Sequence, residues 1–434
     1  MAQVRIYRGG KQLALMLFLS VVAGLAGCHR AKADPASKRF LVLQTNLQPP
    51  YQEFDNGALT GTTIRRLDCA FRKIDVDYGI TLAPRQRNRD MTRKGQADGF
   101  FLSRLSPEMA SYAEPTLPLA LEKWVWVSRH HVNDGPSRVP HPDQNVTVGA
   151  VLGSNEAEWI LDRGYPDVVH APSLRSLIAL LQKGRIDFAV TDQQSFARKR
   201  EDLNLNADDF SERFASYMPL VMYFAHNYIH ENPEILKKLN RALDACEPAV
   251  VKLDHDEQDR IMREEVVRIR QLMRAPALIN ALRNQANQQD PATGTIVSPD
   301  KVVALDRDWQ EASANGTASR LAAEILQNDV STYLQRAYRN RDVRFAEAFI
   351  FDRQGLIIGM SSPTSNYDQS SEAKFNIFAE KTADAVQIAD IYYDPSSSKF
   401  LSQITVPVTD PQNGDVLGAL TVGLDVTAAL TSQD

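Results

Sequence analysis

Polar side chains that could recognise a small solute stand at the ends of predicted strands and the starts of predicted helices. Ser103 directly follows the buried-strand pattern Gly99–Leu102, and α/β proteins bind ligands at the carboxyl ends of such strands. Ser154 and Asn155 precede a helix predicted to begin near Glu156. A side chain there caps the helix, and the free N–H groups can also bind an anion. These positions could contact a ligand, with helix capping as the alternative for Ser154 and Asn155.

Motifs for catalysis, cofactors and metals are missing from the sequence. There is no P-loop, no dinucleotide fingerprint and no Gly-x-Ser-x-Gly elbow. The eight histidines form no metal pattern; His226 and His230 have the spacing of a zinc helix but lack the glutamate that would act as base. We therefore expect no cofactor, no metal and no enzyme activity.

The composition is that of a globular protein with a modest negative charge. Of 434 residues, 43% are apolar and 24% are charged, and the net charge is −5. The first 27 residues carry Arg5, Arg8 and Lys11 and no acid, which leaves −8 on the remainder. A negative chain argues against nucleic acid as a partner, and the length suggests two or three domains.

The N-terminus has the pattern of a secretory signal. The three basic residues precede an apolar run from Leu13 to Gly27, which is shorter than the about 20 residues needed to span a bilayer. A basic start followed by a short apolar core is typical of a cleaved signal. No later run is long and apolar enough for a membrane helix, so we expect the remainder to be extracytoplasmic.

The segment Leu25-Ala26-Gly27-Cys28 resembles the lipobox of bacterial lipoproteins. The resemblance implies that residues 1–27 are removed, that Cys28 becomes an acylated membrane anchor, and that residues 28–38 form a tether. Several acyl chains hold a protein firmly where one gives only marginal binding. Plain secretion is the alternative. His29 stands where an aspartate would retain the protein at the inner membrane, which favours the outer membrane.

The other two cysteines leave two interpretations open. An oxidising compartment permits a disulfide between Cys69 and Cys246. Two buried free thiols explain them equally well, because a sequence cannot show that two residues are close in space.

Residues 39–250 alternate strand and helix patterns, which predicts an α/β architecture with mostly parallel sheets. The strand patterns are Phe40–Gln44, Gly99–Leu102, Lys123–Ser128, Asn145–Val151 and Ile186–Thr191, and the helical ones are Thr62–Ile74, Ser173–Lys183 and Asn232–Leu253.

The second half of the chain reads as helices followed by antiparallel strands. Residues 254–288 have helical spacing with a break or kink at Pro276. A second helical stretch over residues 302–335 is interrupted at Gly316. Strands dominate from Phe345 onward, and Asn413-Gly414 between two apolar runs is a strong hairpin signal. This order predicts an α+β domain.

Three stretches of the first half together resemble the family 3 solute-binding proteins, periplasmic receptors for polar amino acids and similar solutes. They are an opening strand and loop and two steps of helix, glycine, acid and buried strand: Gln48–Gly57, Lys94–Phe101 and Gln182–Asp192. The resemblance implies a bilobed, type II periplasmic-binding-protein fold over residues 39–253, with a ligand cleft between lobes that close by a hinge. Lobe one would be 39–128 with 217–253, and lobe two 129–216.

The family's ligand contacts map onto residues of both lobes. Tyr51 stands where the family places an aromatic ring against the ligand, with a packed loop aromatic as the alternative. Ser154 and Asn155 stand where the family contacts ligand oxygens. Asp192 matches the acid that pairs with a ligand amine, and capping of the helix over 193–200 is the alternative.

The family's carboxylate clamp is missing from its expected position. Ser106-Pro107-Glu108-Met109 matches an element whose last residue is an arginine that holds the ligand carboxylate with a bidentate fork. Met109 replaces that arginine and takes its place among the expected ligand contacts. Arg104, Arg85 and Arg87 could substitute for it, and a solvated basic loop is the alternative for Arg85 and Arg87. The departure favours an anionic, amine-bearing or altered amino-acid-like ligand.

Residues 275–434 resemble the PDC/Cache sensor family, the extracytoplasmic PAS-like domains of bacterial receptors. The likeness is carried by Val303–Trp309, Ile350–Leu356, Ser365–Lys374, Val406–Asp410 and Gly418–Gly423. It implies an α+β domain with an antiparallel sheet over residues 299–434, joined by a helical connector over 254–298. Core or turn roles are the alternative for the four residues expected to line its pocket, Tyr367, Asp368, Asp390 and Tyr392.

These patterns together predict a lipid-anchored receptor that binds a small polar solute and passes its state to a membrane signalling partner. The appended sensor-like domain favours signalling, because a plain transport receptor would end near residue 255. The alternatives are the binding component of an ABC transporter, a cleft enzyme of the cyclic-dehydratase type, and a structural lipoprotein.

Overall fold

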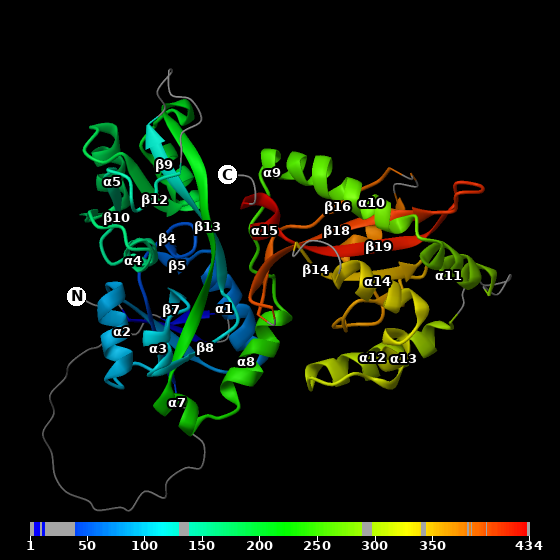
Figure 1. Cartoon of the computed structure of the whole chain (residues 1–434). Helices are drawn as coiled ribbons and strands as arrows, with labels where there is room; N and C mark the ends of the chain where they lie inside the picture. The colour runs from blue at the N-terminus through cyan, green and yellow to red at the C-terminus, as the bar shows by residue number, and fades with distance from the viewer. Residues whose placement is uncertain are drawn as a thin grey trace, which may run out of the picture. The chain divides into compact units, whose positions relative to one another are not determined.

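The computed structural model describes residues 40–129, 139–288, 297–339, 344–379, 382, 384–395 and 397–431, and the backbone of β1 (Val4–Arg8) and β2 (Lys11–Leu13) (Figure 1). The chain divides into unit 1, Met1–Ala249, and unit 2, Val250–Asp434. Cys28 and the expected tether lie outside the described residues. Within the described ranges, no helix is long and apolar enough to cross a membrane.

The first lobe of unit 1 is a parallel sheet covered by helices. Strand β3 pairs in parallel with β6 on one side and with β7 on the other, and β1 pairs with the outer side of β6. Helix α1 presents buried Ile64, Leu67 and Phe71 to the sheet at helical spacing. The elements of this lobe are β3 (Leu41–Thr45), β4 (Glu53–Asp55), β5 (Ala58–Thr60), α1 (Thr62–Lys73), β6 (Tyr78–Leu82), α2 (Arg85–Arg93), β7 (Gly99–Arg104), α3 (Pro107–Ala110), β8 (Ala113–Pro115), α7 (His226–Glu231) and α8 (Ile235–Asp244).

A disulfide fastens α1 to the segment that follows α8. It joins Cys69 to Cys246, whose Cα atoms are 6.2 Å apart, so the structure has the bonded arrangement of the two that the sequence left open. The single helix predicted over Asn232–Leu253 is wrong. Proline disfavours the helical conformation of the residue before it, and Pro233 and Pro248 flank the shorter α8.

The second lobe repeats the arrangement of strands and covering helices. Strand β10 pairs in parallel with β11 and with β12, and the predicted strand and helix patterns of this region are confirmed in position and type. The elements are β10 (Val148–Val151), α4 (Asn155–Asp162), β11 (Val168–Ala171), α5 (Leu174–Gln182), β12 (Phe188–Asp192) and α6 (Gln193–Asp202).

Two long strands connect the lobes. β9 (Ala120–Arg129) and β13 (Phe210–Ala225) pair in antiparallel fashion; β9 also pairs with β12 in lobe two, and β13 with β7 in lobe one. The register of β13 against β9 shifts between Phe214 and Ser216, which marks a bulge at Ala215. Unit 1 therefore has the two-lobed α/β architecture with paired crossover strands that the sequence resemblance implies.

Unit 2 is an antiparallel sheet in the order β15-β14-β19-β18-β16, accompanied by helices. The predicted hairpin is confirmed, because Asn413-Gly414 joins β18 to β19. The predicted helix breaks are confirmed as well: α11 begins at Pro276, and Gly316, with a φ of 70°, follows α12. The elements are α9 (His255–Arg260), a π-helical turn (Ile261–Glu265), α10 (Val266–Met273), α11 (Pro276–Asn287), α12 (Pro299–Ala314), α13 (Arg320–Leu326), α14 (Asp329–Arg339), β14 (Phe345–Asp352), β15 (Ile357–Met360), a 3-10 helix (Ala373–Ala379), β16 (Gln387–Ile388), β17 (Tyr392–Asp394), β18 (Lys399–Thr409), β19 (Val416–Asp425) and α15 (Val426–Thr431).

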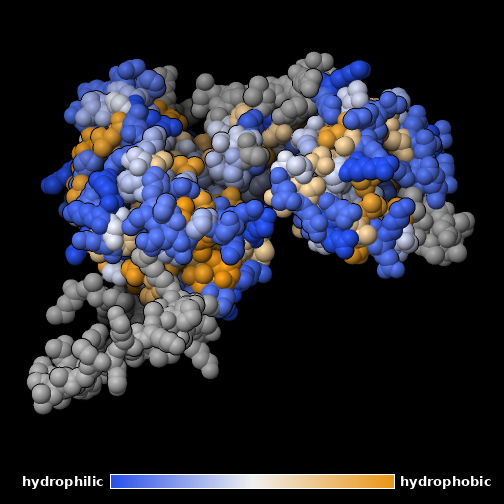
Figure 2. Space-filling view, turned by 90° about the horizontal axis from the view of Figure 1, so that it is seen from below, coloured by the Kyte–Doolittle hydropathy of each residue, from blue (hydrophilic) through white to orange (hydrophobic). Residues whose placement is uncertain are grey.

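The helices that the sequence analysis treats as a connector pack on the sheet of unit 2. Leu282 of α11 is fully buried, and its side chain approaches Gly418 of β19 so closely that a Cβ there would lie 2.5 Å from it. Side chains on the visible face are mostly hydrophilic, with hydrophobic ones in scattered groups (Figure 2).

Candidate ligand-binding site

Tyr51 and Asp192, one from each lobe, lie close together in the interior of unit 1. Tyr51 follows β3, is 3% exposed and belongs to the hydrophobic core of lobe one, as the alternative of a packed loop aromatic predicts. Asp192 ends β12 and is fully buried. Burial and the nearby Asp192 carboxylate raise the pKa of Tyr51 well above its usual value. The Tyr51 hydroxyl and Asp192 Oδ1 have no partner at full hydrogen-bond geometry among the described residues, but the two side chains lie close enough for a hydrogen-bonding interaction with each other. The two lobes thus bring together two buried polar atoms that could bond a solute.

The two oxygens of the Asp192 carboxylate differ in their surroundings. Oδ2 accepts a hydrogen bond from the Ser195 backbone N–H at 2.8 Å and so caps α6. Oδ1 has no partner at full hydrogen-bond geometry among the described residues, and the nearby Tyr51 hydroxyl interacts with this carboxylate. Burial raises the pKa of Asp192 to about 7, although the hydrogen bond from Ser195 opposes the shift. Helix capping and ligand binding, treated as alternatives in the sequence, are compatible roles of one side chain.

Glu122 is a fully buried acid on β9 that the sequence analysis missed. Its Oε1 accepts a hydrogen bond from Gln48 Nε2 at 2.5 Å, and its Oε2 accepts one from Trp124 Nε1 at 2.6 Å. Burial raises its pKa well above the usual range, and the negative charges of Asp192 and Glu156 act in the same direction. An acid two residues before the apolar run Trp124–Val127 is the signal that could have revealed it, because acids are rarely buried unless they are paired.

Glu156 adds a third carboxylate from the first turn of α4. It is 7% exposed, and its charge raises the pKa values of Tyr51, Glu122 and Asp192. The three acids belong to three different elements, β9, α4 and β12, so no local sequence pattern joins them.

Arg85 extends from the start of α2 toward this group. Its Nη1 donates to the Leu102 carbonyl at 2.5 Å, and its Nη2 donates to Gln48 Oε1. Burial lowers its pKa, and the Glu156 and Glu122 charges oppose that effect. The interpretation of Arg85 as part of a solvated loop is wrong, because this segment is a helix whose first residue turns inward.

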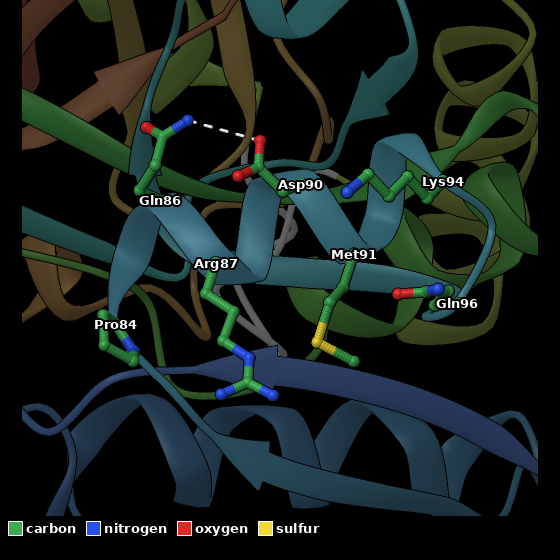
Figure 3. Close-up of a pocket in the computed structure, with 7 residues that line it drawn as sticks. All are labelled: Pro84, Gln86, Arg87, Asp90, Met91, Lys94 and Gln96. Carbon is green, nitrogen blue, oxygen red and sulfur yellow. Dashed lines mark hydrogen bonds between the residues drawn. The ribbon is translucent and has the colours of Figure 1, made fainter.

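Arg87 does not join the group around Tyr51. Its side chain is exposed and extends away from the axis of α2 on a different side of the helix from Gln86 and Asp90 (Figure 3). It lines a separate surface pocket of about 480 Å³ with Pro84, Gln86, Asp90, Met91, Lys94 and Gln96.

Asn155 forms hydrogen bonds from lobe two to the backbone of lobe one. Its Nδ2 donates to the Leu102 carbonyl at 3.2 Å, and its Oδ1 accepts from the Arg104 N–H at 3.3 Å. Ser195 Oγ donates to the Pro49 carbonyl at 3.0 Å as a further bond between the lobes. Asn155 therefore joins the lobes directly, by contacts with protein groups.

Two arginines of lobe one pair with acids on α4 of lobe two. Arg89 forms a two-pronged ion pair with Glu158, in which Nη2 lies 3.2 Å from Oε2. Arg104 approaches Glu158 Oε2 with its Nε at 3.4 Å and Asp162 Oδ2 with its Nη2 at 2.5 Å. Arg104, considered as a substitute carboxylate clamp, is thus occupied by carboxylates of the protein itself.

Three other predicted ligand contacts have packing or capping roles within the protein. Met109 is 1% exposed and packs in the core with Phe100 and Tyr223, so its prediction as a ligand contact is wrong: an apolar side chain at this position turns into the core. Ser154 Oγ accepts from the Ala157 N–H at 3.1 Å and caps α4. Ser103 is buried within β7, opposite Val221 of β13.

The four predicted pocket residues of unit 2 lie in different surroundings. The Tyr367 ring stacks on Trp309 with centroids 5.6 Å apart, and the backbone N–H groups of Tyr367 and Asp368 donate to Asp306 of α12. Tyr392 donates to Glu347 Oε1 of β14 at 3.2 Å, whereas Asp390 is exposed.

Lys374 of unit 2 was not singled out from the sequence. Its Nζ donates to Gln369 Oε1 at 2.9 Å and lies 5.2 Å from the centroid of the Phe349 ring, and burial lowers its pKa.

Comparison with known proteins finds similarity in solved structures only. No protein-family model and no curated protein matches the chain. The arginine-bound form of truncated ArgBP from T. maritima is 16% identical with a TM-score of 0.40, over 48% of this chain and 96% of that one. A histidine kinase sensor domain with similarity to periplasmic binding proteins is 18% identical with a TM-score of 0.42, over 48% and 90%. The GluR0 ligand-binding core in complex with L-glutamate is 18% identical with a TM-score of 0.41, over 48% and 93%.

Proposed function

We propose that this chain is an extracytoplasmic receptor that binds a small polar solute between the lobes of unit 1. The observation that carries the proposal is the pair of buried atoms, the Tyr51 hydroxyl and Asp192 Oδ1, which come from opposite lobes, lie near each other and have no hydrogen bond of full geometry. An unsatisfied buried polar group costs on the order of 1–3 kcal/mol. A solute that bonds both atoms would remove that cost and, because they belong to different lobes, would favour the arrangement in which the lobes meet.

We also propose that the receptor is held at the outer membrane by acylation of Cys28. The disulfide between Cys69 and Cys246 supports an oxidising compartment, because disulfides persist there and are rare in the cytosol. Metabolic labelling with an alkyne fatty acid should tag the wild type and leave Cys28→Ser unlabelled. Labelling of both proteins would contradict acylation at this residue.

Unit 2 is proposed to be the PDC/Cache-like module that passes the bound state to a membrane signalling partner. Its support is the order of helices and antiparallel strands and a core of its own around Trp309 and Phe351. Addition of the bound solute should change hydrogen exchange in unit 2 as well as in unit 1. If hydrogen exchange changes in unit 1 alone, the proposed role of unit 2 in passing on the bound state is wrong, and solute binding by unit 1 still stands.

Thermal-shift screening of the chain from residue 28 onward tests solute binding. A ligand at 100 times its Kd stabilises the native state by about 2.7 kcal/mol, which corresponds to a rise in melting temperature of roughly 5–10 °C. Asp192→Asn and Tyr51→Phe should lose the rise, whereas Asp209→Asn, an exposed acid of the same unit, should keep it. The proposal is wrong if no amino acid, amine or small acid stabilises the wild type.

A further inference from the structure

The backbone of β7 is bulged at Leu102. Val221 of β13 pairs with Ser103 of β7, and the next residue, Met222, pairs with Phe101. Leu102 is therefore the extra residue of the bulge, and its φ of 66° is a left-handed conformation that a leucine rarely adopts. Strain of this kind persists only where the surroundings fix the residue. The contacts of Leu102 therefore indicate what the bulge serves.

The Leu102 carbonyl accepts two side-chain hydrogen bonds, one from each lobe. Arg85 Nη1 of lobe one donates at 2.5 Å, and Asn155 Nδ2 of lobe two donates at 3.2 Å. A carbonyl oxygen has two lone pairs, so these two donors satisfy it. Leu102 is fully buried, and an unpaired buried carbonyl is costly. The Arg85 guanidinium therefore helps to keep this carbonyl where Asn155 binds it.

The second arm of the Arg85 guanidinium leads to the candidate site. Its Nη2 donates to Gln48 Oε1, and Gln48 Nε2 donates to Glu122 Oε1 at 2.5 Å. Glu122 acts in turn on the Tyr51 hydroxyl. Burial lowers the pKa of Arg85, and the charge of Glu156, from lobe two, opposes this shift most strongly. One planar fork thus bonds two acceptors of lobe one and lies within the field of an acid of lobe two.

We propose that Arg85 is an internal occupant of the junction between the lobes: its guanidinium binds the Leu102 carbonyl and Gln48, and a solute has to displace it to reach either group. Because it fixes the Leu102 carbonyl for Asn155, the same guanidinium favours the joined lobes without any solute. The inference goes beyond the proposed function, since it concerns a side chain of the protein and holds whether or not a solute is found.

Chemical rescue tests the occupancy without a solute. Arg85→Ala removes the fork and leaves a space into which a free guanidinium ion fits, with the same planar donors. We expect Arg85→Ala to melt at a lower temperature than the wild type. Guanidinium chloride at about 20 mM should raise the melting temperature of Arg85→Ala by about 3 °C more than the same concentration of sodium chloride does. Ammonium chloride, which has no planar fork, should have a smaller effect than guanidinium chloride.

The wild type and Arg87→Ala are the controls. Both retain Arg85, and Arg87 is an exposed arginine of the same helix, so guanidinium should stabilise neither protein. Equal responses of Arg85→Ala and Arg87→Ala, including no response in either, would overturn the internal occupancy. That outcome would leave the receptor function standing, because the receptor function depends on whether a solute stabilises the wild type.

The wild type provides a second measurement if Arg85→Ala does not fold. In NMR spectra of protein with ¹⁵N-labelled arginine, the guanidinium N–H protons of Arg85 should exchange slowly with water, because two acceptors hold them. The Arg85 signal is the one that is missing from Arg85→Lys, which keeps the positive charge and the flexible stem. Exchange as fast as that of the exposed Arg87 would overturn the proposal.

Discussion

Glu158 is the residue whose replacement most directly tests how the lobes are held together. Its carboxylate pairs with Arg89 and Arg104 across the junction, with side-chain exposures of 6% for Arg89 and 27% for Glu158. Hydrogen bonds between charged groups contribute about 1.5–3 kcal/mol. Glu158→Gln keeps the size of the side chain and one hydrogen-bond acceptor. We therefore expect the free energy that favours joined over separated lobes to fall by about 2 kcal/mol, which corresponds to a factor of up to roughly 30 in the equilibrium constant between the two arrangements.

The weaker junction should lower the affinity for solute and should make the solute-free protein less compact. If the solute binds when the lobes are joined, its apparent Kd rises as the joined fraction falls, so calorimetry on Glu158→Gln should show a Kd raised by up to roughly 30-fold. Small-angle scattering should show a larger radius of gyration without solute. Glu201→Gln, an exposed acid on α6 of the same lobe, is the matched control. A Glu158→Gln protein that is folded and equals the control in both measurements would refute a role for these ion pairs in joining the lobes.

Titration, cross-link removal and core truncation test other parts of the chain. Binding of a solute that carries an amine should weaken as the pH falls through about 7, the pKa of Asp192, because the protonated acid cannot pair with a cation. Calorimetry on Asp192→Asn should show a flatter dependence of affinity on pH, and equal slopes would contradict a role of Asp192 in binding the amine. Without solute, Asp192→Asn should have a higher melting temperature than the wild type at about pH 8 but not at about pH 4. The reason is that folding raises the pKa of Asp192, so ionisation of this acid destabilises the folded protein at pH values above its pKa in the unfolded chain. Equal melting temperatures of the two proteins at both pH values would refute this. Replacing Cys69 and Cys246 by alanine should lower the free energy of unfolding by roughly 2–5 kcal/mol in urea titrations, since the bond spans a sequence separation of 177 residues; no change would contradict a bond formed in the native protein. Trp309→Ala, 2% exposed in the native protein, should cost unit 2 roughly 3–5 kcal/mol, and a loss below 1 kcal/mol would contradict its place in the core.

The alternation of strands and helices was predictable because each element carries its own local pattern. The turn at Asn413-Gly414 and the breaks at Pro276 and Gly316 rest on backbone chemistry that needs no partner. The overlong helix predicted toward Leu253 failed because apolar spacing outweighed the prolines beside α8. Local sequence patterns therefore predicted whether a segment is a helix or a strand better than they predicted where it begins and ends.

Residues of the candidate site could be predicted only where a single local sequence feature points to them. Asp192 was expected at the end of a recognisable strand pattern, and Tyr51 was expected from the resemblance of its loop to the family; the structure brings the two together. Glu122 and Arg85 were missed or misjudged, because their significance depends on neighbours from other elements. Met109 shows the converse: a position inherited from a resemblance gives no information on whether the side chain faces a ligand or the core.

The bulge at Ala215 interrupts the regular pairing of the two strands that the lobes share. Its extra residue lies in β13 opposite Val125 and Trp124 of β9, and a bulged strand bends more sharply than a regular one. Trp124 in turn donates its indole N–H to Glu122. The buried acid Glu122 is therefore tied, through Trp124, to the point at which the shared ribbon of β9 and β13 departs from regular pairing.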